Sequence, residues 1–201
     1  MSLAARIALL LLGVVAVLAW RAELYTVQQP GIAPAPLTLL PPAARLPIEF
    51  DAVLPVVPVG MRRLASDQGP ILIHYWAPWQ HDGRSQARDL DSLAHDPDLA
   101  GLHIAIVCFD PFPSVARYVG RNRLTLPVLL DGPHVLASRL PCPSIPYTYL
   151  IDANGRIAGS LAGDVDWWAP ATIIALRRLI AEPVEVPPAP APVRAPSAPI
   201  S

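Results

Sequence analysis

Apolar and polar residues alternate in blocks along the middle of the chain, between residues 61 and 182. Short apolar runs at residues 70–76, 102–110 and 126–132 are typical of buried strands. Residues 84–96 and 113–123 instead repeat apolar side chains at helical spacing. These apolar positions are Ala87, Leu90 and Ala94 in the first helix, and Val115, Tyr118 and Val119 in the second.

The last part of this region predicts a hairpin followed by a helix. Residues 146–163 contain two runs of strand-forming residues around Asn154-Gly155, a pair that favours a tight primed turn. Residues 169–182 predict a helix with Pro170 in its first turn and an apolar stripe of Ile173, Leu176 and Ile180. The order strand, helix, strand, helix, hairpin, helix predicts an α/β fold with a mixed central sheet flanked by helices.

The N-terminal residues 1–22 form a hydrophobic segment that predicts a membrane anchor. Arg6 supplies a positive charge, and residues 7–20 then run without any charge. A cleaved signal peptide is the alternative, with Val17 and Ala19 as an acceptable cleavage site. We favour a single-pass anchor, and both interpretations place the rest of the chain in the periplasm or another extracytoplasmic space, secreted if cleavage occurs.

Proline is concentrated on both sides of the patterned region. The chain has 26 prolines, and those of residues 23–46 predict a linker that holds residues 47–182 away from the membrane. Residues 47–60 include enough bulky apolar side chains to pack on the domain as an edge segment. Residues 183–201 are rich in Pro and Ala and predict a disordered tail.

Charge argues against one class of partner. The formal net charge is −1, the mean hydropathy is +0.40, and the sequence has no long basic run. Nucleic-acid binding therefore has no electrostatic support.

Three segments resemble the thioredoxin-like superfamily. They are "ILIHYWAPW", "LPVLLDGPHVLASRLPCPSIPYTYLIDANGRI" and "LAGDVDWWAP". The closer resemblance is to the membrane-anchored, extracytoplasmic TlpA/ResA-type thiol–disulfide oxidoreductases of the redoxin family, which include cytochrome c maturation reductases. It covers about residues 47–181 and implies a thioredoxin-like fold.

The same resemblance places a C-x-x-C motif directly after Trp79. There the first thiolate would be stabilised by a helix N-terminus, and the second thiol would resolve a mixed disulfide. Neither Gln80 nor Gly83, which occupy these two positions, has a sulfur atom. The resemblance therefore implies a degenerate active site without dithiol chemistry, formed by Gln80, His81, Asp82 and Gly83.

A second feature of the resemblance is a groove that receives an extended peptide. It would be formed by Trp79 and by the backbone at Ile145 and a cis Pro146. The expected partner is thus an extended peptide or protein in the envelope, and no cofactor is expected.

Other polar residues leave alternatives open. His74 lies where the family usually has an acidic or amide side chain that moves protons, although a hydrogen-bonded core histidine is the simpler interpretation. His81 and Asp82 are weak candidates for a metal site because no third ligand is evident. Cys108 and Cys142 are candidates for a disulfide, and Cys142 is also a candidate for a lone reactive thiol.

The leading hypothesis is a membrane-tethered binding or accessory module in envelope redox chemistry or cytochrome c maturation. The first alternative is a monothiol oxidoreductase that uses Cys142, with His74 or His81 as proton partner. The second is a metal-binding chaperone that uses His81 and Asp82.

Overall fold

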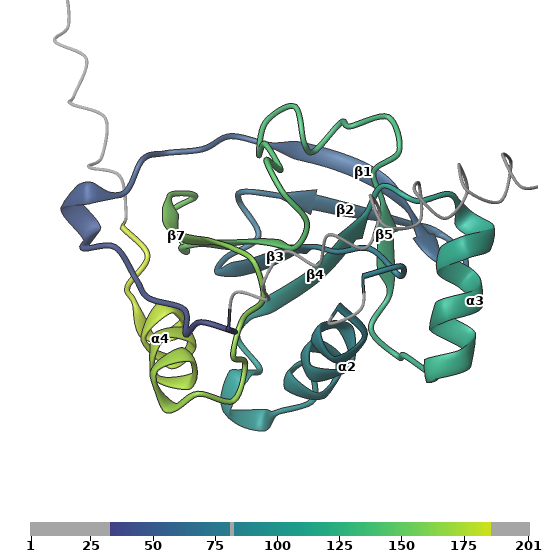
Figure 1. The fold of residues 1–201 in the computed structure, drawn as a ribbon. Helices are drawn as coiled ribbons and strands as arrows, with labels where there is room; N and C mark the ends of the chain where they lie inside the picture. The colour runs from purple at the N-terminus through teal and green to yellow at the C-terminus, as the bar shows by residue number, and fades with distance from the viewer. Residues whose placement is uncertain (1–32, 81–82, 186–201) are drawn as a thin grey trace, which may run out of the picture. The chain divides into compact units, whose positions relative to one another are not determined.

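The computed structural model describes residues 33–80 and 83–185 (Figure 1). The predicted anchor at residues 1–22, residues 186–201 of the predicted tail, and both His81 and Asp82 lie outside the described residues. Within the described ranges, no helix combines the length and the apolar character that a membrane crossing requires.

A mixed seven-stranded sheet forms the centre of the domain. Its strand order is β2-β1-β5-β4-β3-β6-β7, with β3, β4 and β5 parallel and the other neighbours antiparallel. The predicted α/β class with a mixed sheet is confirmed. The strands are β1 (Asp51–Val57), β2 (Met61–Ala65), β3 (Ile71–Tyr75), β4 (His103–Cys108), β5 (Val128–Leu130), β6 (Tyr147–Ile151) and β7 (Ile157–Ala162).

Side chains of three α-helices pack in the core cluster on one face of the sheet, and side chains of the long loop 131–146 pack in the cluster on the other face. Central strands are therefore buried on both sides, as in β3, where all five residues are buried. Leu72 packs in the cluster that includes helical side chains, whereas Ile71 and Ile73 pack in the cluster that includes loop residues. The helices are α2 (Gly83–Leu93), α3 (Phe112–Asn122) and α4 (Pro170–Ala181), with short 3₁₀ turns η1 (Pro42–Ala44) and η2 (Pro97–Leu99).

The hairpin β6–β7 is present, but its turn is longer than a two-residue primed turn. The Asp152 N–H donates to the carbonyl of Arg156 at 2.9 Å, which leaves residues 153–155 as the loop. Gly155 has a φ of +69°, the left-handed conformation that a three-residue hairpin loop requires. The Asp152 carboxylate favours this longer loop because it accepts from the N–H groups of Asn154 and Arg156, both at 2.9 Å.

Two predictions about the N-terminal part of the domain need correction. Strand β1 is not an edge segment, because it pairs with β2 on one side and with β5 on the other. Residues 34–46, predicted as part of the linker, lie against the domain: Ala35 bridges to Val165, and Leu37 is buried. The physical reason is that this segment has polar and apolar partners on β7 and α4, including the Thr172 hydroxyl, which accepts from the Leu37 N–H at 3.1 Å.

The buried face of helix α4 differs from the predicted apolar stripe. Of the three predicted positions only Leu176 lies in the core, whereas Ile173 and Ile180 are half-buried. The Thr172 hydroxyl donates to the carbonyl of Asp166 at 2.7 Å, which turns this polar residue inward. The other buried positions of the helix are Ala175 and Leu179.

Candidate functional site

The turn after β3 places its two tryptophans in opposite environments. The Trp76 N–H donates to Val107 of β4 at 2.8 Å, which keeps Trp76 in line with the strand. Its ring is fully buried and packs on Tyr118 of α3 with ring centroids 4.6 Å apart. Trp79 lies in the turn itself and is 67% exposed. Only Trp79 is therefore available to a partner molecule.

The loop that leads into β6 is held in a defined position beside this turn. Two tyrosine hydroxyls donate to its backbone, Tyr75 to Leu140 at 2.9 Å and Tyr149 to Pro141 at 2.7 Å. The Ile145–Pro146 peptide bond is cis, as the resemblance implied, and Pro146 is buried. The Val57–Pro58 bond is also cis, which the sequence did not indicate.

Gln80 joins the turn to the loop. Its side-chain amide donates from Nε2 to the carbonyl of Ile145 at 2.6 Å, although 65 residues separate the two in sequence. The Gln80 Oε1 atom is buried and has no hydrogen-bond partner within the described chain. The side chain at the first C-x-x-C position thus contacts the backbone of the predicted peptide groove, and it offers one unused acceptor there.

The predicted groove residues are therefore brought together. Trp79 and Ile145 lie on the two segments that Gln80 connects, and the Pro146 carbonyl accepts from Gly163 at 2.9 Å. Gly83 begins α2 directly after the turn. Dithiol exchange needs sulfur at positions 80 and 83, and neither residue supplies it.

His74 is a fully buried strand residue close to this site. Its Nδ1 lies 2.9 Å from the Thr148 hydroxyl, and its ring meets Trp167 edge-on with centroids 5.5 Å apart. Burial lowers its pKa from 6.5 to about 3, so the imidazole is neutral near neutral pH. The Nε2 atom is buried without a hydrogen-bond partner in the described chain. This environment fits the interpretation as a core histidine.

Both cysteines are free thiols, so no disulfide joins them in this structure. Cys108 is buried at the end of β4, and burial raises its pKa to about 12. Cys142 is half-buried, and burial raises its pKa to about 11. Its thiol donates to the carbonyl of Ser144 at 3.0 Å. Because the thiolate is the reactive form, neither environment activates a nucleophile near neutral pH.

The metal alternative rests on residues that are not described. His81 and Asp82 lie outside the described ranges, and no group of three potential ligands occurs among the residues inside them.

Trp167 and Trp168 differ in exposure. Trp167 is buried and donates to Gln86 at 2.6 Å, whereas Trp168 is 52% exposed and donates to Asp89 at 3.2 Å.

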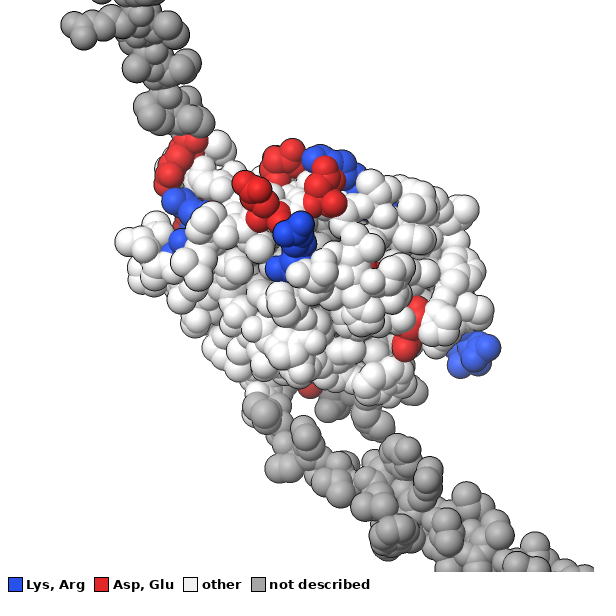
Figure 2. Space-filling view, turned by 90° about the horizontal axis from the view of Figure 1, so that it is seen from above, with Lys and Arg blue, Asp and Glu red and all other residues white. Residues whose placement is uncertain are grey.

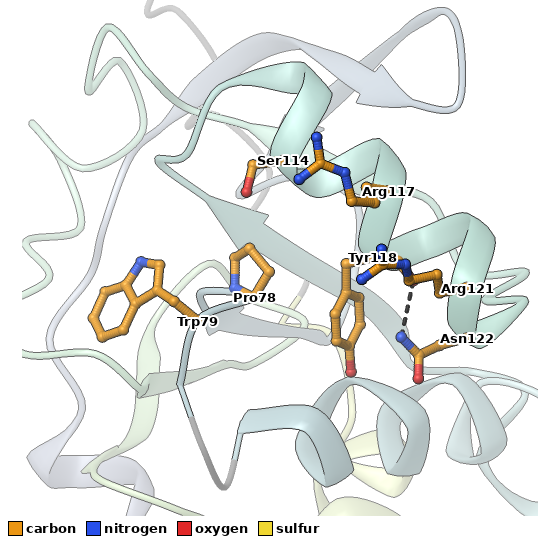
Figure 3. Close-up of a pocket in the computed structure, with 7 residues that line it drawn as sticks. All are labelled: Pro78, Trp79, Ser114, Arg117, Tyr118, Arg121 and Asn122. Atoms are coloured by element: carbon orange, nitrogen blue, oxygen red, sulfur yellow. Dashed lines mark hydrogen bonds between the residues drawn. The ribbon is translucent and has the colours of Figure 1, made fainter.

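A shallow cleft of about 380 Å³ lies between the turn and α3. Pro78 and Trp79 line one side, and the α3 residues line the other (Figure 3). The α3 side was not predicted from the sequence, although Arg117 and Arg121 are four residues apart on the helix. The α3 residues that line the cleft are Ser114, Arg117, Tyr118, Arg121 and Asn122.

Charge elsewhere on the domain is mixed. On the face seen in Figure 2, acidic and basic side chains lie beside one another and leave much of the surface uncharged. Arg63, for example, donates to the carboxylates of Asp51 at 2.9 Å and of Asp67 at 3.2 Å. Such a surface has no extended basic stripe for a nucleic-acid backbone.

The fold resembles that of solved thiol–disulfide proteins and peroxiredoxins. A secreted thiol-disulfide isomerase from Corynebacterium glutamicum matches with a TM-score of 0.60 and 20% identity, covering 78% of this chain and 99% of its own. StoA from Bacillus subtilis matches with a TM-score of 0.54 and 17% identity, covering 67% and 97%. A peroxiredoxin Q mutant from Xanthomonas campestris matches with a TM-score of 0.56 and 19% identity, covering 72% and 98%.

These similarities confirm the thioredoxin-like fold. No protein-family model matches the sequence, and no curated protein matches it. The narrower resemblance to the TlpA/ResA type stays a prediction.

Proposed function

We propose that this chain is a thioredoxin-like binding module that holds an extended peptide or protein partner and performs no dithiol chemistry. The partner would lie against Trp79 and the backbone at Ile145 and Pro146. The observation that carries this proposal is the Gln80 amide, which occupies the first C-x-x-C position and is hydrogen-bonded to Ile145.

The geometry suits binding better than redox catalysis. A large aromatic side chain that is mostly exposed beside a rigid loop is a common anchor for peptides. The two thiols nearest this end of the sheet are protonated near neutral pH because burial raises their pKa values. Gln80 places an amide where the family has a nucleophile, and an amide cannot exchange a disulfide.

The location follows from the N-terminal sequence. Residues 1–22 would tether the chain to a membrane, with the domain on the extracytoplasmic side. The partner would belong to envelope redox chemistry or cytochrome c maturation. This assignment rests on the resemblance to TlpA/ResA-type proteins and on the structural similarity to a secreted thiol-disulfide isomerase.

One assay separates binding from redox activity. The full chain, in mild detergent, is incubated with insulin and dithiothreitol beside an active thioredoxin, and insulin precipitation is followed by turbidity. We expect no rate above the dithiothreitol background. Clear turnover that disappears in Cys142→Ser would overturn the proposal in favour of a monothiol oxidoreductase.

The binding half is tested with random dodecapeptides displayed on phage and captured on the immobilised full chain. We expect selected peptides to lose at least tenfold in affinity for Trp79→Ala, because an exposed aromatic anchor is the typical hot spot. Trp168→Ala is the matched control, since Trp168 is similarly exposed but is not a residue of the predicted groove. Equal losses in the two variants would argue against binding at Trp79.

A further inference from the structure

Among the described residues, those that line the cleft between Trp79 and α3 carry charge of one sign. Arg117 and Arg121 line it, and no acidic residue of ranges 33–80 and 83–185 does (Figure 3). Both arginines are exposed, and neither makes an ion pair with any described residue. By contrast, four other arginines of the described chain have acidic partners, namely Arg45, Arg63, Arg156 and Arg177.

The fold itself explains only part of this arrangement. Residues four apart on a helix lie on the same face, where two like charges repel each other. Arg121 lies in the last turn of α3, where a positive charge interacts favourably with the helix dipole. Arg117 lies one turn earlier and gains little from that dipole. A negative group placed between the two guanidinium groups would relieve their repulsion.

We propose that this cleft selects partners with an acidic side chain next to the apolar residue that contacts Trp79. The inference rests on the proposed function and specifies the class of peptide. A guanidinium group binds a carboxylate through two parallel hydrogen bonds, so an Asp or Glu of the partner has a matching site at Arg117 and Arg121. The partner therefore carries its acidic residue on the side of the turn that faces α3.

A peptide fits this site better than an anionic membrane surface does. The site is concave and contains two cations on α3, across from Pro78 and Trp79 of the turn. Membrane-binding patches typically gather about four to eight basic residues on an open surface. The cleft instead has only two basic residues among its lining, and they lie in a hollow beside Trp79.

The phage selection on the full chain provides the test. We expect Asp or Glu to be enriched beside an apolar residue in the peptides captured by the wild-type chain. Fluorescence anisotropy with a selected peptide should then show about tenfold weaker binding to Arg117→Gln/Arg121→Gln, corresponding to the loss of two exposed charge-assisted contacts. The same peptide with Asn or Gln in place of its acidic residues should bind both proteins equally.

The matched control is Arg139→Gln/Arg178→Gln, which removes two exposed arginines that do not line the cleft. This control should bind the acidic peptide like the wild type. Selection of Trp79-dependent peptides without acidic enrichment would overturn the inference and leave the proposed function intact. If no peptide is selected, both fail. In that case, direct binding of dihexanoyl phosphatidylserine, but not of the choline lipid, that is lost in Arg117→Gln/Arg121→Gln would assign the cleft to lipid.

Discussion

The two ends of the central sheet treat buried polar groups differently. The far end, where β6 meets β7 at residues 152–156, is built on ion pairs. Arg45, almost completely buried, donates to Asp152 at 3.0 Å and binds Glu182 through both of its terminal nitrogens. The Arg156 side chain forms a second ion pair with the Asp152 carboxylate at 2.9 Å. Every charge in this cluster has a partner of opposite sign.

The site end, where β3 and β4 finish and β6 begins, leaves polar atoms unused. Three of its residues have a buried polar atom without a hydrogen-bond partner in the described chain. They are Nε2 of His74, Oε1 of Gln80 and Oδ2 of Asp110. Each such atom costs free energy, and native proteins usually avoid that cost.

The difference indicates which end is optimised for stability. At the far end, paired charges join the N-terminal segment, the hairpin and the end of α4. At the site end, incomplete hydrogen bonding is the pattern expected where a protein gives up stability to contact something else. The absence of cysteine therefore has not turned the site end into an ordinary part of the core.

The largest expected effect is at the far end. Asp152→Asn keeps the shape of the side chain but leaves Arg45 with only Glu182, and Arg156 with only the exposed Glu185, as acidic partners among the described residues. Breaking a buried ion pair in this way should lower the free energy of unfolding by about 3–5 kcal/mol. Urea unfolding followed by circular dichroism measures the loss.

Arg63→Gln is the control for that change, because it removes an arginine from exposed ion pairs on β2. Its cost should stay below about 1 kcal/mol. If Asp152→Asn costs no more than Arg63→Gln, the far end is not the stabilising end and the contrast between the two ends fails.

The second effect is a dependence of stability on pH that is caused by His74 at the site end. The unfolded His74 takes up a proton below about pH 6.5, whereas the folded one resists protonation down to about pH 3. Stability should therefore decrease as the pH falls from about 6.5, by about 3 kcal/mol at pH 4. The double variant His74→Leu/Thr148→Val removes both polar partners. Its free energy of unfolding should therefore lack most of this decrease. His103→Gln, an exposed histidine, should retain it.

The far end should respond only in stronger acid. Burial by itself would raise the pKa of Asp152, but hydrogen bonds from the Arg156 backbone and from the Arg45 and Arg156 side chains lower it overall. Its stabilising contribution is thus present above its ordinary pKa of 3.8 and is lost as the pH falls below that value. If stability is lost only below about pH 4 and is unchanged between pH 4 and 6.5, the expectation that the site end responds first is wrong.

The fold was accessible from the sequence because local patterns and global packing agree. The run at residues 70–76 is apolar throughout, and β3 is buried on both faces. Errors arose where a distant partner decides the outcome. Leu37 and Arg45 read as linker residues because their partners, Thr172 and Asp152, lie more than 100 residues away.

The candidate site was predictable in its outline and not in its contacts. The resemblance located Trp79 and the cis Pro146, because family motifs record backbone positions. It gave no information on where a glutamine amide would point at the position of a missing thiol. The Arg117 side of the cleft was missed for a related reason: which helix face borders the turn depends on how α3 packs on Trp76 through Tyr118.

The smallest loss of stability is expected for replacing Gln80, and Gln86 provides the comparison. Gln86 is buried and makes three hydrogen bonds, to both backbone groups of Val165 and to the Trp167 indole. Gln80 is partly exposed and makes one, to Ile145. Replacing Gln86 with Leu should lower the free energy of unfolding by about 3 kcal/mol, because three buried partners lose their hydrogen bonds.

Gln80→Leu should cost about 1 kcal/mol or less, since it removes one hydrogen bond together with an acceptor that has no partner. It also frees the Ile145 carbonyl to accept from a peptide N–H, so selected peptides should bind this variant at least as tightly as the wild type. Anisotropy titration measures that affinity, and urea unfolding measures the stability of both variants. If Gln80→Leu is as costly as Gln86→Leu, Gln80 is a structural tie between two loops. If instead it keeps its stability but loses peptide binding, the Gln80 side chain contributes to binding the partner.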